Sequence, residues 1–394
     1  MTVQPESATA APLTMAAAVA DRGRVVEHTF ARNGDPGPPR LAWFVDGLAR
    51  AMRDRGYDEI AEPGPTVQVV LHALDAGQPR PYRRRNAPTF VVALAHLPAP
   101  PDDLLRTGYP LLVRGLANLA VLVSDGPDGP VASFVTLEQG TYRVDHLGDD
   151  DKFFTAVLER VEPLATSRLV IANEFLPDLP EALWAGDDQT AQITRAGERL
   201  GALDLLPAAF PIEEILSERD LRHVKLLYGI GGLSYGNVSA RRLPPTESPW
   251  GPEFWMSASG VDKANLREIG RDILLVRGYE PAHDSIVLSI PPDVKPNRVS
   301  VDAIEHWMIY REHPDVHAIL HVHAWIEGTV ATEINYPCGT VELATSVADL
   351  VRQAPDPTRA VVGQKNHGLT ITGHSLDEIF ARIDGHIVRA VPME

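Results

Sequence analysis

The chain contains one cysteine, Cys338, among its 394 residues. A single thiol excludes an intrachain disulfide framework and any metal site built mainly from cysteines. Positive charge is also scarce, because 36 lysines and arginines are outnumbered by 53 aspartates and glutamates, for a formal net charge of −17. Nucleic-acid binding needs a basic surface. We therefore predict no nucleic-acid partner.

Long apolar runs are missing as well, since none approaches the ~20 residues that a membrane helix needs. The first 20 residues are rich in Ala, Thr and Pro but lack the basic start and apolar centre of a signal peptide. We interpret residues 1–24 as a disordered tail. The remaining composition, 44% hydrophobic and 23% charged, is that of a globular chain long enough for two domains. We expect a cytoplasmic protein with no membrane part.

The first half of the sequence predicts a mixed α/β domain over residues 25–180. No motif in it indicates a role. Apolar residues recur at helical spacing from Leu41 to Met52, which predicts a helix over 41–55. Apolar, β-branched runs bounded by turn residues predict strands. The other expected elements are strands at 66–73, 89–97, 120–123, 132–143 and 168–172 and helices at 103–119 and 153–164.

A stretch rich in Pro, Asp, Gly and Ala follows, and we interpret residues 181–205 as a linker that includes a short helix over 189–200. Residues 206–394 form the second predicted domain. Its signals are more specific than those of the first half.

Val316–Ala324 reads Val-His-Ala-Ile-Leu-His-Val-His-Ala and predicts a buried strand. Side chains alternate along a strand, so His321 and His323 point to the same side. Two neutral imidazoles on one side can bind one metal ion, although they could equally be hydrogen-bonded core histidines. His367, after a second apolar run, could complete a three-histidine site with an open position for substrate, which is the arrangement of a catalytic metal site.

Two turns of small residues precede this strand. Residues 231–241 form a glycine-rich turn in which Asn237 offers a side-chain donor, and residues 256–262 form another around Ser259 and Gly260. Such turns let backbone N–H groups approach an anion such as phosphate or carboxylate. Ordinary hairpin turns would have the same composition.

A helix is predicted over 301–312, and Asp302 lies in its first turn beside Ser300. A carboxylate there could simply interact with the helix N-terminus. The functional alternative is a general acid/base held near the metal.

Four motifs in this order resemble the class II aldolase/adducin family over about residues 210–394. They are Gly-Asn-Val-Ser (236–239), Ser-Ala-Ser-Gly (257–260), Ile-Tyr-Arg-Glu-His-Pro-Asp-Val-His-Ala-Ile-Leu-His-Val-His (309–323) and Lys-Asn-His-Gly (365–368). The resemblance implies an α/β/α fold, a small-molecule substrate, a homo-oligomer and a divalent metal, most often zinc, with manganese, cobalt or iron as alternatives. It assigns the metal ligands to His321, His323 and His367 and the anion-binding turns to Asn237, Ser259 and Gly260.

The sequence departs from the family pattern before the helix. The family has Ser-Ser-Glu with the glutamate as acid/base, whereas this chain has Ser300-Val301-Asp302. Asp302 is one methylene shorter, and Val301 removes a hydroxyl that helps to bind phosphate. Arg298 or Lys295 could supply the missing anion contact.

The resemblance implies carbon–carbon lyase chemistry of the aldolase or decarboxylase type, through a metal-stabilised enediolate of a small hydroxyketone or keto-acid. Asp302 would move the proton. Two alternatives stay open: a non-haem iron oxygenase on the same fold, because three histidines also hold iron, and a non-catalytic adducin-like binding module.

Overall fold

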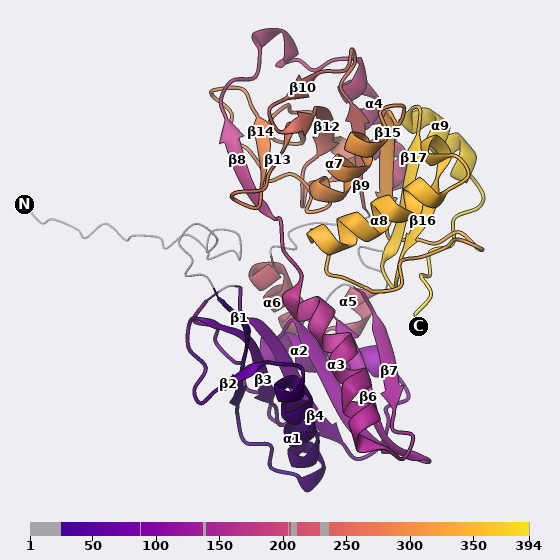
Figure 1. Cartoon of the computed structure of the whole chain (residues 1–394). Coiled ribbons are helices and arrows are strands. Elements are labelled where there is room, and N and C mark those ends of the chain that lie inside the picture. Colours follow the sequence, from indigo (N-terminus) through magenta and orange to yellow (C-terminus); the bar gives the residue numbers. More distant parts are fainter. Residues whose placement is uncertain are drawn as a thin grey trace, which may run out of the picture.

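The structure is a computed structural model that describes residues 25–86, 88–136, 139–203, 205, 211–228 and 236–393. These residues contain two large β-sheets, one in each half of the chain (Figure 1). The predicted tail, residues 1–24, lies outside the described residues, as does the 231–235 part of the glycine-rich turn.

The first sheet has seven strands in the order β2-β1-β3-β4-β5-β6-β7. β1 to β5 pair in parallel, and β6 and β7 continue the sheet antiparallel. Parallel neighbours need crossover connections; α1 supplies the one from β1 to β2 and α2 the one from β4 to β5, whereas the described residues between β3 and β4 contain no helix. The elements are β1 (Val26–Asn33), α1 (Pro39–Asp54), β2 (Asp58–Ile60), β3 (Val67–Ala73), β4 (Phe90–Leu97), α2 (Leu104–Gly115), β5 (Leu119–Gly126), β6 (Gly129–Thr136), β7 (Thr141–Asp145) and α3 (Asp150–Thr166).

Helices cover both faces of this sheet. α1 and α3 share one hydrophobic core with it, and α2 packs into another core on the opposite face. The helix predicted from Leu41, Phe44 and their neighbours is confirmed, and these side chains are buried in the first core. Period-3.6 spacing predicted this helix correctly because one apolar stripe faces the sheet.

The single strand predicted across 132–143 is wrong, because the chain reverses between β6 and β7. Thr136 Oγ1 donates to the Gly140 carbonyl at 3.1 Å and accepts from the Gln139 N–H at 2.9 Å. Gly140 has a φ of +63°, in the left-handed region that glycine adopts at no steric cost. The apolar run therefore folds into two adjacent antiparallel strands.

The second sheet has eight strands in the order β16-β17-β15-β9-β12-β13-β14-β8. All its neighbours pair antiparallel except β14 and β8. The elements of this half are β8 (Ala172–Leu176), α4 (Asp188–Ala202), α5 (Ile212–Ile215), α6 (Glu218–Tyr228), β9 (Gly236–Arg241), β10 (Glu247–Ser248), β11 (Gly251–Pro252), β12 (Phe254–Ser257), β13 (Ile273–Glu280), β14 (Ser285–Ser289), α7 (Ala303–Glu312), β15 (Ala318–Val322), α8 (Val341–Gln353), β16 (Val361–Gln364), β17 (Gly368–Gly373) and α9 (Leu376–Ile383), with 3-10 turns at Glu181–Leu183, Lys263–Asn265 and Pro357–Arg359.

The second sheet lies between two helical layers. α7 and α8 contribute to the core on one face, and α4 and α9 contribute to the core on the other. The predicted α/β/α arrangement of this half is therefore confirmed, as is the separate, sheet-rich first half. The helices expected at 189–200 and 301–312 are α4 and α7.

The strand predicted at 168–172 forms four residues later, as β8, and pairs in parallel with β14 of the second sheet. Ile193 of α4, inside the predicted linker, is fully buried in the core of that sheet. These contacts lead us to propose that the two halves divide between α3 and β8.

The two halves also touch through Ile212 of α5, Leu216 just after it and Val224 of α6, which belong to the core around α2. Arg114 of α2 forms an ion pair of 2.6 Å with Asp220 of α6, which is 1% exposed. Among the described residues no helix is both long and apolar enough to cross a membrane.

Candidate metal centre

The register of the second sheet assembles the site. β15 lies between β9 and β17, and His321 is directly opposite Asn237 on one side and Thr370 on the other. Residues that are directly opposite in antiparallel strands project to the same face. Three polar side chains thus form one row across three central strands, on the face that α7 covers.

Three histidines converge at the end of this row. His321 lies in β15, His323 follows it, and His367 lies in the turn between β16 and β17. One ring nitrogen from each lies within 4.8 Å of the others, and the Nε2 atoms of His321 and His367 are 3.2 Å apart. His321 and His367 are buried, and His323 is half-buried. The structure thus brings together the three predicted ligands.

The donor set suits a divalent metal. Burial, and then the neighbouring His367, hold the pKa of His321 well below its ordinary value. A neutral imidazole keeps the lone pair that a metal ligand needs. Three imidazoles at this separation would repel one another if protonated, whereas one cation between them could bind all three.

Asp302 lies beside this cluster, with Oδ2 4.0 Å from His321 Nε2. Asn237 Nδ2 donates to the same oxygen at 2.7 Å and to Ser300 Oγ at 3.0 Å. Asp302 Oδ1 is buried and has no hydrogen-bond partner in the described part of the chain. The Asp302 side chain makes no capping hydrogen bond to the start of α7 within that part, so the simple capping alternative is not observed. Burial raises its pKa.

Glu305, one turn along α7, is a buried carboxyl that the sequence reading did not assign to the site. It accepts hydrogen bonds from Thr370 Oγ1 at 2.5 Å and Gln364 Nε2 at 2.8 Å. Gln364 Nε2 also lies 3.3 Å from His321 Nδ1, the ring nitrogen opposite the cluster. Burial and then the charge of Asp302 raise the pKa of Glu305 to about 8. The one feature of the sequence that indicated its place was the i+3 spacing from Asp302, which puts both side chains on the same face of the helix.

Lys263 is a second buried ionisable residue that the sequence did not indicate. It is 1% exposed, and its Nζ donates to the Ala258 carbonyl at 2.5 Å. Burial lowers the pKa of Lys263 to about 8, and nearby aspartates including Asp302 oppose that shift. A lysine just after a small-residue turn reads as a surface residue in the sequence, so nothing indicated its burial.

The second predicted turn lies against the same corner of the sheet. The Ser259 N–H donates to the Arg298 carbonyl at 2.8 Å, and Ala258 forms an isolated antiparallel β-bridge with Val299. This pairing places Ser259 opposite Arg298, whereas Gly260 is exposed. Arg298 is half-buried, and its side chain makes no hydrogen bond or ion pair to the residues that the structure describes; burial lowers its pKa. A cation partly withdrawn from water without an anionic partner is suited to bind an anion.

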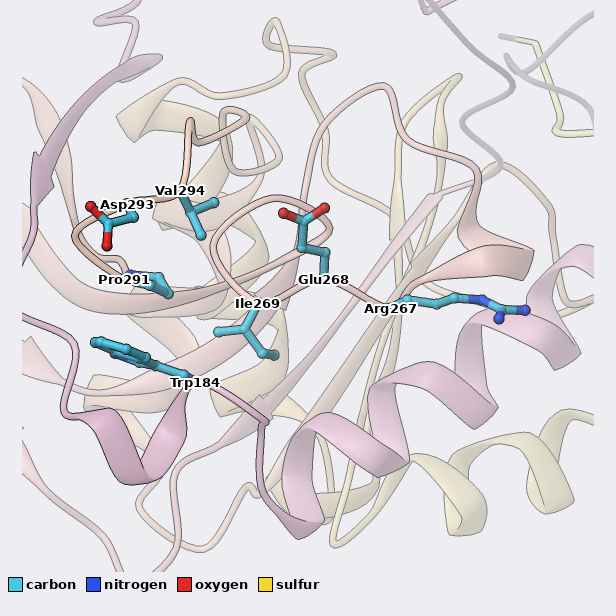
Figure 2. A pocket seen from close by; sticks show the side chains of 7 residues that line it. All are labelled: Trp184, Arg267, Glu268, Ile269, Pro291, Asp293 and Val294. Atoms are coloured by element: carbon cyan, nitrogen blue, oxygen red, sulfur yellow. The ribbon is translucent and has the colours of Figure 1, made fainter.

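A surface pocket of 390 Å³ lies elsewhere, formed by Trp184, Ile269 and Val294 with charged residues around it (Figure 2). The Glu268 and Asp293 carboxylates line it, while the Arg267 side chain extends away from Trp184. None of its lining residues belongs to the histidine cluster or its neighbours.

Comparison with protein families gives a match over residues 222–333 to the model described as Class II Aldolase and Adducin N-terminal domain. The matched segment includes Asn237, Asp302, His321 and His323, and it ends before His367. No curated protein matches the chain. The match supports an aldolase-type lyase in general terms.

Solved structures resemble about half of the chain. An L-fuculose 1-phosphate aldolase is 18% identical, over 51% of this chain and 82% of its own, with a TM-score of 0.33. YgbL from Escherichia coli, a putative aldolase/epimerase/decarboxylase, is 17% identical over 49% and 82%, with a TM-score of 0.31. An aldolase II superfamily protein from Pseudomonas syringae is 17% identical over 50% and 72%, with a TM-score of 0.30.

Proposed function

Residues 222–333 belong to the class II aldolase and adducin family, and from this premise we propose that the chain is a divalent-metal-dependent carbon–carbon lyase of the aldolase or decarboxylase type. The observation that carries the proposal is the convergence of His321, His323 and His367 within 4.8 Å, with the Asp302 carboxylate 4.0 Å from His321. A binding module has no need of a buried carboxylate beside three converging imidazoles.

The three histidines hold the metal, most often zinc in this family, with manganese, cobalt or iron as alternatives. When bound, a divalent metal supplies a Lewis acid that polarises an oxygen of the substrate. Gln364 donates to Glu305 and lies against His321 Nδ1, the ring nitrogen that faces away from the cluster. Groups in this position commonly orient metal-bound histidines.

Asp302 is the general acid/base of this proposal. Asn237 and Ser300 engage its Oδ2 and thereby fix the orientation of the carboxyl group. Oδ1, which has no partner among the described residues, is the atom that takes or returns the substrate proton. Because burial raises the pKa of Asp302, a proton taken from carbon is held more strongly there than by an exposed aspartate.

Arg298 favours a keto-acid over an uncharged hydroxyketone as substrate. Its guanidinium is half-buried without an anionic partner in the described chain, and its planar fork matches a carboxylate. Asn237, Ser259, Gly260 and Ser300 complete the substrate-binding set of the proposal. The family also leads us to propose a homo-oligomer that works in the cytoplasm.

Elemental analysis of protein purified without a histidine tag tests the metal. About one zinc, manganese or cobalt ion per chain, lost in the His321→Ala/His323→Ala variant, is the expected result. Iron at the same stoichiometry would redirect the proposal to an oxygenase. No metal after reconstitution would contradict a metal enzyme and favour a binding module.

Activity is tested by a screen of keto-acid and hydroxyketone substrates with the metal-loaded protein. Asp302→Asn keeps the size of the side chain but removes the base, so we expect kcat to fall about 10²- to 10⁴-fold with metal content unchanged. Asp302→Glu retains a carboxyl and should retain more activity. An Asn variant as active as the wild type would remove Asp302 from the mechanism.

A further inference from the structure

His367 is flanked by two chain segments that the first half of the chain contacts directly, and it belongs to one of them. One is the 335–338 segment, whose Cys338 Sγ lies 3.4 Å from His367 Nε2. The other is the β16–β17 turn, in which His367 itself follows Asn366. Residues at the β6–β7 end of the first sheet reach both segments.

Gln139 makes the first contact. Its side-chain amide donates to the Tyr336 carbonyl, and the residue is only 4% exposed. Its backbone is held in turn by the Thr136 hydroxyl at 2.9 Å. Gly140 follows, and a Cβ at this position would lie 1.9 Å from Met393 Sδ. The turn is therefore held by a hydrogen bond within its own sheet, and it packs closely against the C-terminal segment at Met393.

Asn366 makes the second contact. Its Nδ2 donates to the Thr141 carbonyl at 3.4 Å, and the residue is 2% exposed. Asn366 has a φ of +58°, in the left-handed region that is uncommon for residues other than glycine. This hydrogen bond connects Thr141 in the first half to Asn366 in the second half. Asn366 has a constrained backbone and immediately precedes His367, a proposed metal ligand.

Tyr142 makes the third contact. Its ring stacks on Phe134 of β6, with centroids 4.8 Å apart, and its buried hydroxyl lies near the Asn335 side chain without forming a hydrogen bond in the described part of the chain. Both Tyr142 and Asn335 are buried. Three residues within one short stretch, Gln139, Thr141 and Tyr142, therefore contact the segment that bears His367 and the segment that packs against it.

We propose that the β6–β7 end of the first half is a positioning element for the metal centre, which holds His367 in the geometry that metal binding requires. This inference rests on the proposed metal site, and it assigns a role to a half of the chain that carries no motif. Gln139 and Asn366 act through the backbone around His367 and are positioning residues. They do not touch substrate.

The test measures Zn²⁺ affinity of the full chain by competition with a chromophoric chelator. Gln139→Ala removes the first donor, and Asn366→Gly removes the second while keeping a residue that adopts positive φ freely. Loss of groups that orient ligands typically weakens metal binding about 10- to 100-fold. We expect at least a 10-fold weaker Kd in the double variant, with a changed visible absorption spectrum of the Co²⁺-loaded protein.

Gln78→Ala, an exposed glutamine of the same half, is the matched control and should leave both readouts unchanged. Metal-free unfolding curves separate the alternatives, because a merely structural contact would lower stability without changing the Kd or the Co²⁺ spectrum. That result would overturn the inference and leave the metal site intact. A wild-type chain that binds neither metal would overturn the proposed function as well.

Discussion

Asn237 donates a hydrogen bond of 2.7 Å to the Asp302 carboxylate, although the two residues are 65 positions apart in the sequence. Asn237 lies in β9, opposite His321 in the sheet, and Asp302 immediately precedes α7. The bond therefore connects the row of polar side chains in the sheet with the helix that covers it.

Asn237→Ala should reduce kcat/KM by about 10- to 100-fold, because Asp302 loses the partner that orients it. The Asn237 hydrogen bond lowers the pKa of Asp302 against the effect of burial. Its loss raises that pKa, so the acidic limb of the kcat/KM profile should move to higher pH. Asn265→Ala, at an exposed asparagine, is the control. An unshifted limb would contradict the role of Asn237.

Glu305→Gln should change how stability depends on pH in the metal-free protein. The pKa of Glu305 is raised from 4.5 to about 8, so the folded chain binds this proton more tightly than the unfolded chain. Its contribution to stability is full below pH 4.5 and is lost as the pH rises through about 8. Glutamine stays neutral throughout.

Urea unfolding at pH 5 and pH 8 measures this effect. The free energy of unfolding of Glu305→Gln should improve relative to wild type between the two values. Glu327→Gln, at an exposed position, should follow the wild-type curve. Parallel pH curves for Glu305→Gln and wild type would show that the buried carboxyl does not titrate as we infer.

Zn²⁺ should raise the unfolding temperature of the wild type and have no such effect on His367→Ala. At 100 times the Kd, binding to the folded state adds about 2.7 kcal/mol. For a domain of about 150–250 residues, this free energy corresponds to a rise in unfolding temperature of about 5–10 °C. His374→Ala, at an exposed histidine, should respond like the wild type. An equal shift in His367→Ala would place the bound zinc elsewhere.

Arg298→Ala should raise KM for a keto-acid about 10-fold or more and leave kcat less affected, because the guanidinium would bind the carboxylate without taking part in proton transfer. A hydroxyketone without a carboxylate should show little change. Arg219→Ala, at an exposed arginine, serves as control. Equal losses for both substrate types would argue against anion recognition by Arg298.

Local patterns in the sequence predicted most regular elements and the three histidines. Two-residue periodicity put His321 and His323 on one side of a strand, and helical spacing predicted α1. These features depend on neighbours in the chain, which is why they could be read directly. The anion-binding role of Ser259 and Arg298 stays a prediction.

Only the tertiary structure decided which distant groups share the site. Strand order and register place Asn237 and Thr370 on either side of His321, and helix packing buries Glu305 and Lys263. Register across a sheet depends on long-range pairing, and the burial of a charge depends on what packs over it. The sequence by itself determined the ligand types, whereas the contact of Gln139 and Thr141 with the turn that bears His367 arises from how the two halves pack.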